Sequence, residues 1–584
     1  MQFKQTLVRL LPLLFPCTAF SQTTYFPQDA RENLLIERLE IKAQTDTVFN
    51  FSKTKPYSRK SFIPEIERYY VSGAYPRFIE VPVPDSLRKL INPIELPSNP
   101  GLSKVDQYNI GIALMNSPEW ATQDFSSKKR FLKGFYTSPA YLYEVNVKDF
   151  FLAINPVFQY VVGKEKNNDE NIFLNTRGAT IRGRIADKIG FDAYITDNQE
   201  RDPLYVQRVV SAHKAVPGEG FYKNFKTTGY DYFDARGSVT FGVTKYIDVQ
   251  FGYDKNFIGN GYRSLFLSDV SAPNLFLKLN TRIWKFNYEN LFMELNSANR
   301  LNADKLLPKK YAAMHHLDMG ITKWLNVGLF EGIIFGRENH FEFSYLNPII
   351  FYRSIEQQNG SYDNAVVGLD MKANVAKRFQ FYGQFLLDEF NLTELKRGSG
   401  WWANKFGYQL GAKYIDAFNI HNLDLQIESN RVRPFTYSHT DSVANYTHYN
   451  QTLAHPLGAN FQEFIGTARY QPAPRWLVQA RAIYYVQGRD SSNISYGSNI
   501  FLPNVPPYRN MDFGYEVGSG LRTRVGIASF LLSYELKPNL FVETNAVFRK
   551  ERADATASTA AKTTNTSVIY FGIRWNMWRR EFNF

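Results

Sequence analysis

Three histidines of one polar stretch are the residues whose types come closest to a chemical site. His439, His448 and His455 lie between residues 431 and 458, together with Asp441. Imidazole and carboxylate groups can bind a metal ion or a sugar, or serve as base and acid beside a nucleophile. The histidines lack the i, i+4 spacing of a helical zinc motif, and nucleophile candidates beside them are few. We therefore predict no catalytic residue and no metal or other cofactor, with a hydrolase using His439 and His448 as a remote alternative.

Other short motifs also have simpler structural explanations. His315 and His316 are consecutive at the start of a predicted strand, so alternation sends their rings to opposite faces rather than to one site. Gly259-Asn260-Gly261 resembles part of a phosphate-binding loop, but no helix follows it, which favours a bend in an external loop. Trp401-Trp402 could stack on a sugar ring or belong to an aromatic girdle at a membrane surface.

Charged side chains recur on one face of strands whose other face is apolar. From Trp476 to Gln487 the alternate residues are apolar, whereas Gln479, Arg481 and Gln487 share the opposite face. This split is typical of a membrane barrel with a lipid-facing and a lumenal side. Because both signs of charge occur on the lumenal side, we predict salt-bridge networks that fill the barrel rather than an open pore. The predicted lumenal network consists of Lys405, Lys413, Asp424, Glu428, Arg481, Glu543, Arg549 and Arg574.

The elements that carry these residues repeat from residue 141 onward as strand, tight turn, strand and longer polar loop. Eight tight turns joining sixteen strands, with one strand before and one after, predict about eighteen strands with both ends in the periplasm. The first strand would span about 141–163 and the last about 566–577, followed by an aromatic ending at Phe584; stretches 345–355 and 512–522 also look strand-like. The predicted turns lie near residues 187–188, 245–246, 284–285, 323–324, 377–378, 416–417, 472–474 and 538–539.

The N-terminal part of the chain differs from this repeat. Residues 1–21 combine a basic start, an apolar run and a small-x-small ending, which predicts a secretory signal peptide. A lipoprotein signal using Cys17 is the alternative, but Phe15 and Pro16 do not suit it. Residues 22–140 show helical spacing at 29–43 and 105–115, separated by many prolines. We predict a small helical and irregular periplasmic element that caps or partly enters the barrel mouth, followed by the barrel over residues 141–584.

Composition agrees with an exported barrel. Aromatic residues make up 16% of the chain although its mean hydropathy is −0.35, which suits aromatic girdles around a polar interior. Cys17 is the only cysteine, so a mature chain cleaved after Ser21 would contain no disulfide, cysteine-ligated zinc or cysteine nucleophile. The net charge of +13 is compatible with attraction to anionic lipopolysaccharide or to an acidic polymer, and export argues against a nucleic-acid partner.

Several strings in order resemble the Wzi-type capsule-assembly outer-membrane proteins, including the gliding-motility protein RemB. They are Ser264–Asp269, Phe343–Arg353, Asp363-Asn364 leading to Gly368–Asp370, Tyr382–Phe390 and His455–Gly458. The resemblance covers roughly residues 140–584. It implies an eighteen-stranded barrel with a helical periplasmic element, no enzymatic activity, and a role in organising surface polysaccharide or in gliding motility.

We therefore expect a non-enzymatic outer-membrane barrel whose partners are membrane lipid and lipopolysaccharide, surface polysaccharide, and secretion or motility machinery. A diffusion channel for small nutrients is the alternative, because the same barrel would serve it. The stretches 390–403 and 431–458 are the predicted outer contact surface. Its predicted polysaccharide contacts are Trp401, Trp402, Tyr446, His448 and Tyr449.

Overall fold

The structure is a computed structural model, and residues 1–21, the predicted signal segment, lie outside the part that it describes. The described residues are 24–28, 30–70, 101–125, 127, 135–186, 188–297, 307–337, 340–349, 351–360, 362–490, 494–555 and 560–584.

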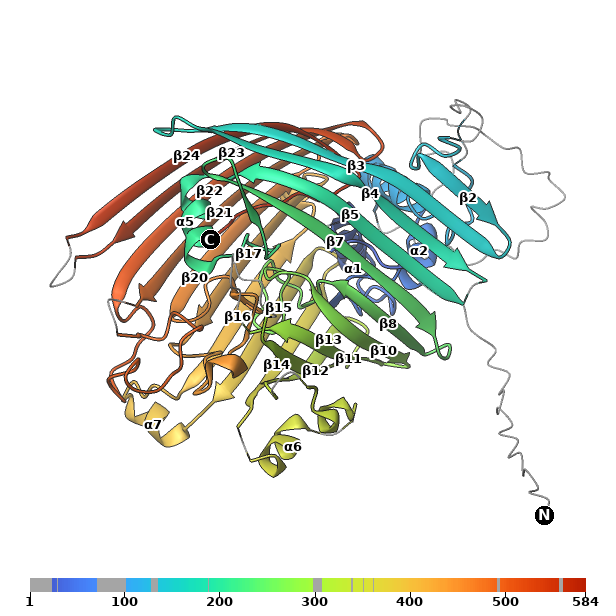
Figure 1. Cartoon of the computed structure of the whole chain (residues 1–584). Helices are drawn as coiled ribbons and strands as arrows, with labels where there is room; N and C mark the ends of the chain where they lie inside the picture. The colour runs from blue at the N-terminus through green and yellow to red at the C-terminus, as the bar shows by residue number, and fades with distance from the viewer. Residues whose placement is uncertain are drawn as a thin grey trace, which may run out of the picture.

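Antiparallel strands form a closed barrel (Figure 1). The ring closes where β24 pairs with β3, from Val568 opposite Glu165 to Trp575 opposite Phe158. This confirms the predicted eighteen-stranded all-β barrel. The strands of the wall are β3 (Phe150–Glu165), β4 (Asn171–Ile185), β5 (Ile189–Arg201), β7 (Gly229–Gly242), β8 (Ile247–Asp254), β10 (Asn274–Ile283), β11 (Phe286–Asn296), β12 (Lys309–Gly320), β13 (Leu325–Phe335), β14 (Asn364–Val375), β15 (Phe379–Glu389), β16 (Lys405–Tyr414), β17 (Leu423–Val432), β20 (Phe461–Tyr470), β21 (Trp476–Arg489), β22 (Leu521–Lys537), β23 (Leu540–Ala553) and β24 (Lys562–Trp575).

The connections divide the barrel into two unlike ends. At the short-turn end, neighbouring strands are joined by brief turns such as Pro538–Asn539, where Asn539 takes a left-handed backbone conformation (φ 61°) that asparagine tolerates well. All eight predicted tight turns lie at this end. At the opposite, long-loop end the connections are longer, and they include 202–228, 255–273, 336–363, 390–404, 433–460 and 490–520.

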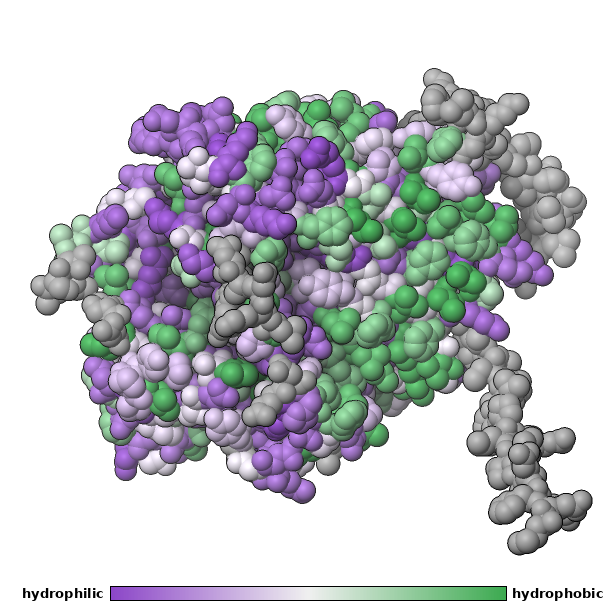
Figure 2. All heavy atoms as spheres, viewed as in Figure 1, coloured by the Kyte–Doolittle hydropathy of each residue, from purple (hydrophilic) through white to green (hydrophobic). Residues whose placement is uncertain are grey.

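Side chains alternate across the wall as the sequence predicts. On β21, Trp476, Val478 and Tyr484 are 40–47% exposed on the outer face, whereas Gln479 and Arg481 are buried on the inner face. Figure 2 shows hydrophobic residues gathered over the strands near β8 and β10 and hydrophilic residues over the long loops. The apolar outer face suits contact with lipid, and the polar inner face requires partners inside the lumen.

A helical unit, here called the plug, occupies the lumen at the short-turn end. It comprises the described residues between 24 and 125, with α1 (Arg31–Ala43), β1 (Thr54–Lys55), α2 (Arg59–Glu67) and α4 (Lys104–Met115). The helices pack on one another through buried residues such as Leu35, Ile63 and Leu114. The helices predicted at 29–43 and 105–115 thus correspond to α1 and α4. None of the described helices is long and apolar enough to cross a membrane.

Three strand predictions need correction. The first predicted strand, 141–163, is a hairpin of β2 (Tyr143–Val147) and β3, with a turn at 148–149. The strand-like stretch 345–355 instead contains the 3₁₀ helix η1 (Phe343–Leu346) and α6 (Tyr352–Gln358), and 512–522 is loop until β22 begins. In both stretches the apolar pattern combines buried loop residues, such as Tyr345 and Tyr515, with exposed ones, such as Ile349 and Phe513. The remaining short elements among the described residues are α5 (Leu204–His213), β6 (Lys223–Phe225), β9 (Phe257–Ile258), α7 (Leu392–Arg397), η2 (Ala417–Asn419), η3 (Ser442–Ala444), β18 (Thr447–His448) and β19 (Gln451–Thr452).

Candidate functional site

The eight charges predicted for the lumen all lie on the inner face, buried or nearly so, and each has a partner. Most of them contact residues of the plug, of an inward loop or of the chain end, which the strand pattern alone could not identify. The partners are Asp388 and Glu389 for Lys405, Glu37 for Lys413, Arg38 for Asp424, the backbone of Tyr262 and Arg263 for Glu428, Glu581 for Arg481, Arg574 and Arg579 for Glu543, and Glu551 for Arg549.

The plug is attached to the wall by buried ion pairs. Lys53 is 1% exposed and lies between Asp318, at 3.0 Å, and Asp370. Glu40 of α1 contacts Lys372 of β14 at 2.6 Å. Removing either partner of such a pair would leave a buried charge without compensation, so these contacts fix the position of the plug.

Glu37 shows how strongly the wall acts on the plug. Its carboxylate lies 2.7 Å from the ammonium group of Lys413 and 3.5 Å from the guanidinium of Arg469. Burial alone would raise the pKa of Glu37, but these two cations lower it to about 2. The carboxylate is therefore ionised at neutral pH.

The connection 255–273 enters the lumen from the long-loop end and meets the plug. Its strand β9 pairs with β1 of the plug, with Ile258 opposite Thr54. Beyond this pairing, the backbone N–H groups of Tyr262 and Arg263 donate to Glu428, at 2.7 and 3.1 Å. At Gly261 any Cβ would lie 2.6 Å from a Glu428 carboxylate oxygen, so glycine permits this approach. The Gly259–Gly261 bend is thus inside the barrel, which corrects its prediction as an external loop.

The residues after β24, here called the tail (576–584), also turn into the lumen. Arg579 contacts Glu543 at 2.5 Å, Arg580 contacts Glu200 at 2.8 Å, and Glu581 contacts Arg481. Trp578 packs on Tyr194 with ring centroids 4.5 Å apart. The last strand therefore ends at Trp575 rather than near 577, and the aromatic ending lies inside the barrel instead of continuing the wall.

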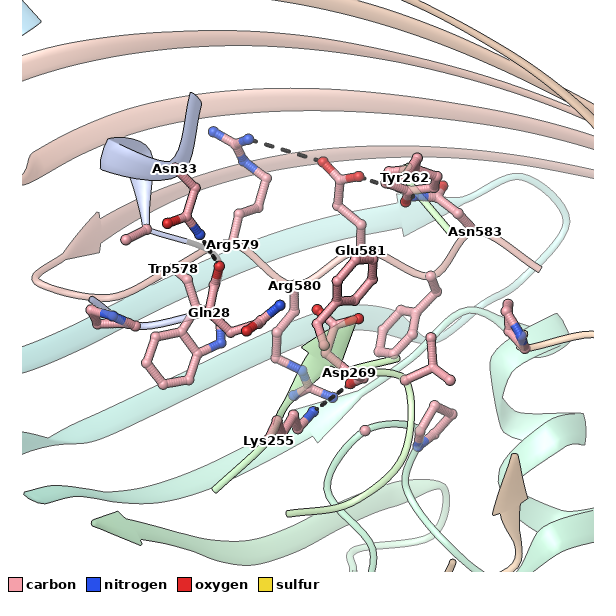
Figure 3. A pocket seen from close by; sticks show the side chains of 18 of the residues that line it. Gln28, Asn33, Lys255, Tyr262, Asp269, Trp578, Arg579, Arg580, Glu581 and Asn583 are labelled. Carbon is pink, nitrogen blue, oxygen red and sulfur yellow. Dashed lines mark hydrogen bonds and ion pairs between the residues drawn. The ribbon is translucent and has the colours of Figure 1, made fainter. Parts of the chain in front are cut away.

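A cavity of about 1490 Å³ remains between the plug, the tail, α5 and the wall. Figure 3 shows Trp578 and Arg580 of the tail beside Lys255 and Asp269 of the inward connection at its lining. The lining mixes charged, amide and aromatic groups, a combination that can hydrogen-bond and stack on a hydroxyl-rich ligand.

The histidine-rich connection 433–460 also folds inward. Tyr446 is fully buried, and its hydroxyl donates to the Phe266 carbonyl at 2.7 Å. His448 is 3% exposed and lies between the Asn296 amide and the Pro273 carbonyl, whereas His455 contacts Glu463 at 2.7 Å. Tyr446 and His448 thus hold the loop in place and present no exposed surface. Within the described residues, no three His, Cys, Asp or Glu side chains come together in a group that could hold a metal ion.

Trp401 and Trp402 lie on the other predicted contact loop, and both are half-buried. Trp402 stacks beneath the Arg509 guanidinium at 4.2 Å from the ring centroid, and its amide donates to the Asp512 carbonyl at 3.0 Å. The connections 390–404 and 490–520 therefore form one surface. Phe390, Tyr508 and Phe513 are 40–51% exposed on it, and Lys396 is exposed nearby on α7. We call Phe390, Trp401, Trp402, Tyr508 and Phe513 the aromatic loop surface.

Tyr449, the remaining predicted contact, is half-buried. Its ring lies next to Gly220, which belongs to the connection 202–228.

Sequence reasoning missed the tail charges and Lys53. Arg579, Arg580 and Glu581 are consecutive, so they interrupt the period-two pattern directly after β24. That interruption is a signal that the wall has ended. Lys53 offers no comparable signal, because a single lysine in an irregular segment is usually exposed to solvent.

Comparison with known proteins agrees with this architecture. The sequence model of the capsule assembly protein Wzi family matches residues 206–529. Among solved structures, the carbohydrate-binding barrel Wzi of Escherichia coli, involved in group 1 capsule assembly, shares 12% identity at a TM-score of 0.55, covering 95% of this chain and 100% of Wzi. OprD of Pseudomonas aeruginosa shares 12% identity at a TM-score of 0.40, covering 72% of this chain and 95% of OprD. A search of curated proteins gave no match. The family match spans more than half of the sequence, and the chain therefore belongs to the capsule assembly protein Wzi family.

Proposed function

We propose that this protein is a non-enzymatic outer-membrane barrel that binds surface polysaccharide at its long-loop end and keeps it at the cell surface. Membership of the Wzi capsule assembly family carries the proposal. In this arrangement the short-turn end and the plug face the periplasm, as do the start of β3 and the end of β24. This is usual for bacterial barrels with short periplasmic turns.

The filled lumen supports a binding role over a diffusion channel. The plug enters from one end, the connection 255–273 enters from the other, and the two meet in the β1–β9 pairing. The tail crosses between them, and its side chains form ion pairs with Glu200 of β5, Arg481 of β21 and Glu543 of β23. Planar-bilayer recordings should accordingly show almost no steady conductance, and a large stable conductance would favour the channel instead.

The aromatic loop surface is the proposed contact with polysaccharide. Aromatic faces can cover the apolar face of a sugar ring, and neighbouring cations such as Lys396 suit an acidic polymer. Among its members, Phe513 is the most exposed, at 51%. Tyr446 and His448 do not belong to this surface, because both are buried.

Binding of purified protein to a panel of acidic and neutral capsular polysaccharides tests this assignment. We expect Phe513→Ala and the double variant Trp401→Ala/Trp402→Ala to weaken binding at least about tenfold, the equivalent of about 1.4 kcal/mol. Trp284→Ala is the control, because Trp284 is 77% exposed at the short-turn end. Binding to no member of the panel, or equal weakening in all three variants, would contradict the proposal.

The biological role is tested in cells. A deletion strain should release surface polysaccharide or lose spreading motility, and the wild-type gene should restore it. Unchanged polysaccharide retention together with unchanged spreading would exclude both roles.

A further inference from the structure

One long connection folds over the outside of the barrel instead of into it. Residues 336–363, here called the outer lobe, join β13 to β14 and contain η1 and α6, which lies outside the wall near β12 and β14 in Figure 1. Tyr345 of η1 and Tyr352 of α6 are fully buried. The Tyr345 ring packs on Phe335 with centroids 4.7 Å apart, and the Tyr352 ring packs on His315 at 4.0 Å.

Alternation along β12 and β13 shows that this contact is on the outer face. His316 points inward and contacts Asp370 at 2.7 Å, so His315 points outward. Phe330 points inward and stacks on Phe266 at 4.5 Å, so Glu331 also points outward. The outer lobe therefore covers the side of the wall that elsewhere in the barrel is apolar and exposed.

The covered part of the wall is unusually polar. His315, Glu331 and Asn290 lie in adjacent register positions on β12, β13 and β11, and each is at most 7% exposed. The Glu331 carboxylate accepts a hydrogen bond from the Arg353 amide at 3.1 Å. Such groups are costly against hydrocarbon, and the outer lobe removes them from it.

The opposite surface of the outer lobe restores an apolar exterior. Phe343, Ile349 and Phe351 are 73–85% exposed there. On the neighbouring strand β14, whose Val367 is paired with Glu331, Val367 and Leu369 remain 39% and 48% exposed. The lobe also reaches well down the wall, because the Tyr288 hydroxyl, only four positions after the short-turn residue Trp284, donates to the Pro348 carbonyl.

We propose that the outer lobe lies in the membrane, with Phe343, Ile349 and Phe351 against the acyl chains of the lipid. The lobe thus replaces the wall as the lipid-contacting surface over β11–β13. This inference depends on the proposed outer-membrane location of the barrel.

Lipid contact is measured with single cysteines in a Cys17→Ser background, since Cys17 is the only cysteine of the chain. Ile349→Cys reports on the lobe, Leu369→Cys on the bare wall, and Lys396→Cys on the exposed helix α7. Each variant carries an environment-sensitive bimane label and is reconstituted into phosphatidylethanolamine–phosphatidylglycerol vesicles. Quenching by doxyl-labelled lipid is compared with quenching by aqueous iodide, and heat-modifiable gel migration verifies folding.

We expect the label at Ile349 to resemble that at Leu369, with several-fold stronger quenching by doxyl lipid than by iodide, and the label at Lys396 to show the reverse. If Ile349 resembles Lys396, the lobe is in water and the inference is wrong. If neither agent quenches Ile349, a protein surface or a second copy covers the lobe, which also overturns it. If Leu369 is not quenched by lipid, the proposed membrane location itself fails.

Discussion

The two ends of the lumen are closed by different kinds of contact. At the short-turn end, charged residues of the plug contact charged residues of the wall, as in Arg31 with Glu535 at 2.7 Å. At the long-loop end, inward connections pack aromatic and aliphatic side chains around Leu265, Phe266 and Tyr446. Ion pairs demand one geometry and fail when one partner is lost, whereas apolar packing tolerates small changes. The plug is thus positioned by charge and the loops by shape.

The largest effect is expected from breaking the charge contact of Lys53. Lys53→Met leaves Asp318 and Asp370 without their cation in a buried site, which should lower the free energy of unfolding by about 3–5 kcal/mol. Urea unfolding followed by tryptophan fluorescence in detergent measures it. Adding Asp318→Asn and Asp370→Asn should restore part of the loss.

Arg397→Met is the matched control for this prediction. Arg397 forms a 2.7 Å pair with Glu394 on α7 of the long-loop end, and the Arg397 side chain is 68% exposed. The loss should stay below about 1 kcal/mol. Equal losses in the Lys53 and Arg397 variants would show that buried charge does not position the plug.

Acid should weaken the short-turn end through Glu37. The pKa of Glu37 falls from its ordinary 4.5 to about 2 on folding, so its contribution is complete above pH 5 and is lost as the pH falls through about 2. The contribution is at most about 3 kcal/mol. The difference in unfolding free energy between wild type and Glu37→Gln should therefore shrink between pH 5 and pH 2. A constant difference over this range would exclude the ion pairs with Lys413 and Arg469 as its source.

The smallest effect is expected at the long-loop end. Tyr446→Phe keeps the packed ring and removes only the hydrogen bond to the Phe266 carbonyl, which should cost about 1 kcal/mol. Tyr508→Phe, on a side chain that is 40% exposed, should change nothing measurable. A loss of 3 kcal/mol or more in Tyr446→Phe, approaching the value for Lys53→Met, would remove the contrast between the two ends.

Local patterns explain why so much of the wall could be predicted. Each strand displays its own period-two alternation, as in Gln479 and Arg481 against Val478 and Tyr484, and each tight turn separates two such runs. Helical spacing likewise predicted α1 and α4. These signals need no knowledge of distant residues, because pleat and helix periods are properties of the local backbone.

The candidate site was less accessible to sequence reasoning. Tyr446 and His448 have the residue types of a sugar contact, yet long-range packing buries them against residues 266 and 273. Trp401 and Trp402 are half-buried at the surface, where Arg509 of the connection 490–520 packs on Trp402. Whether a loop aromatic is a contact or a core residue depends on which distant segments cover it.

The sequence by itself determined a barrel wall with an apolar outer face and a charged inner face, because consecutive residues of a strand point to opposite faces. Only the tertiary structure decided what completes each face: the plug, the connection 255–273 and the tail inside, and the outer lobe outside. Those choices depend on pairings such as Arg580 with Glu200 and Tyr352 with His315, whose members are far apart in the chain. Such pairings follow from three-dimensional packing and leave no periodic trace in the sequence.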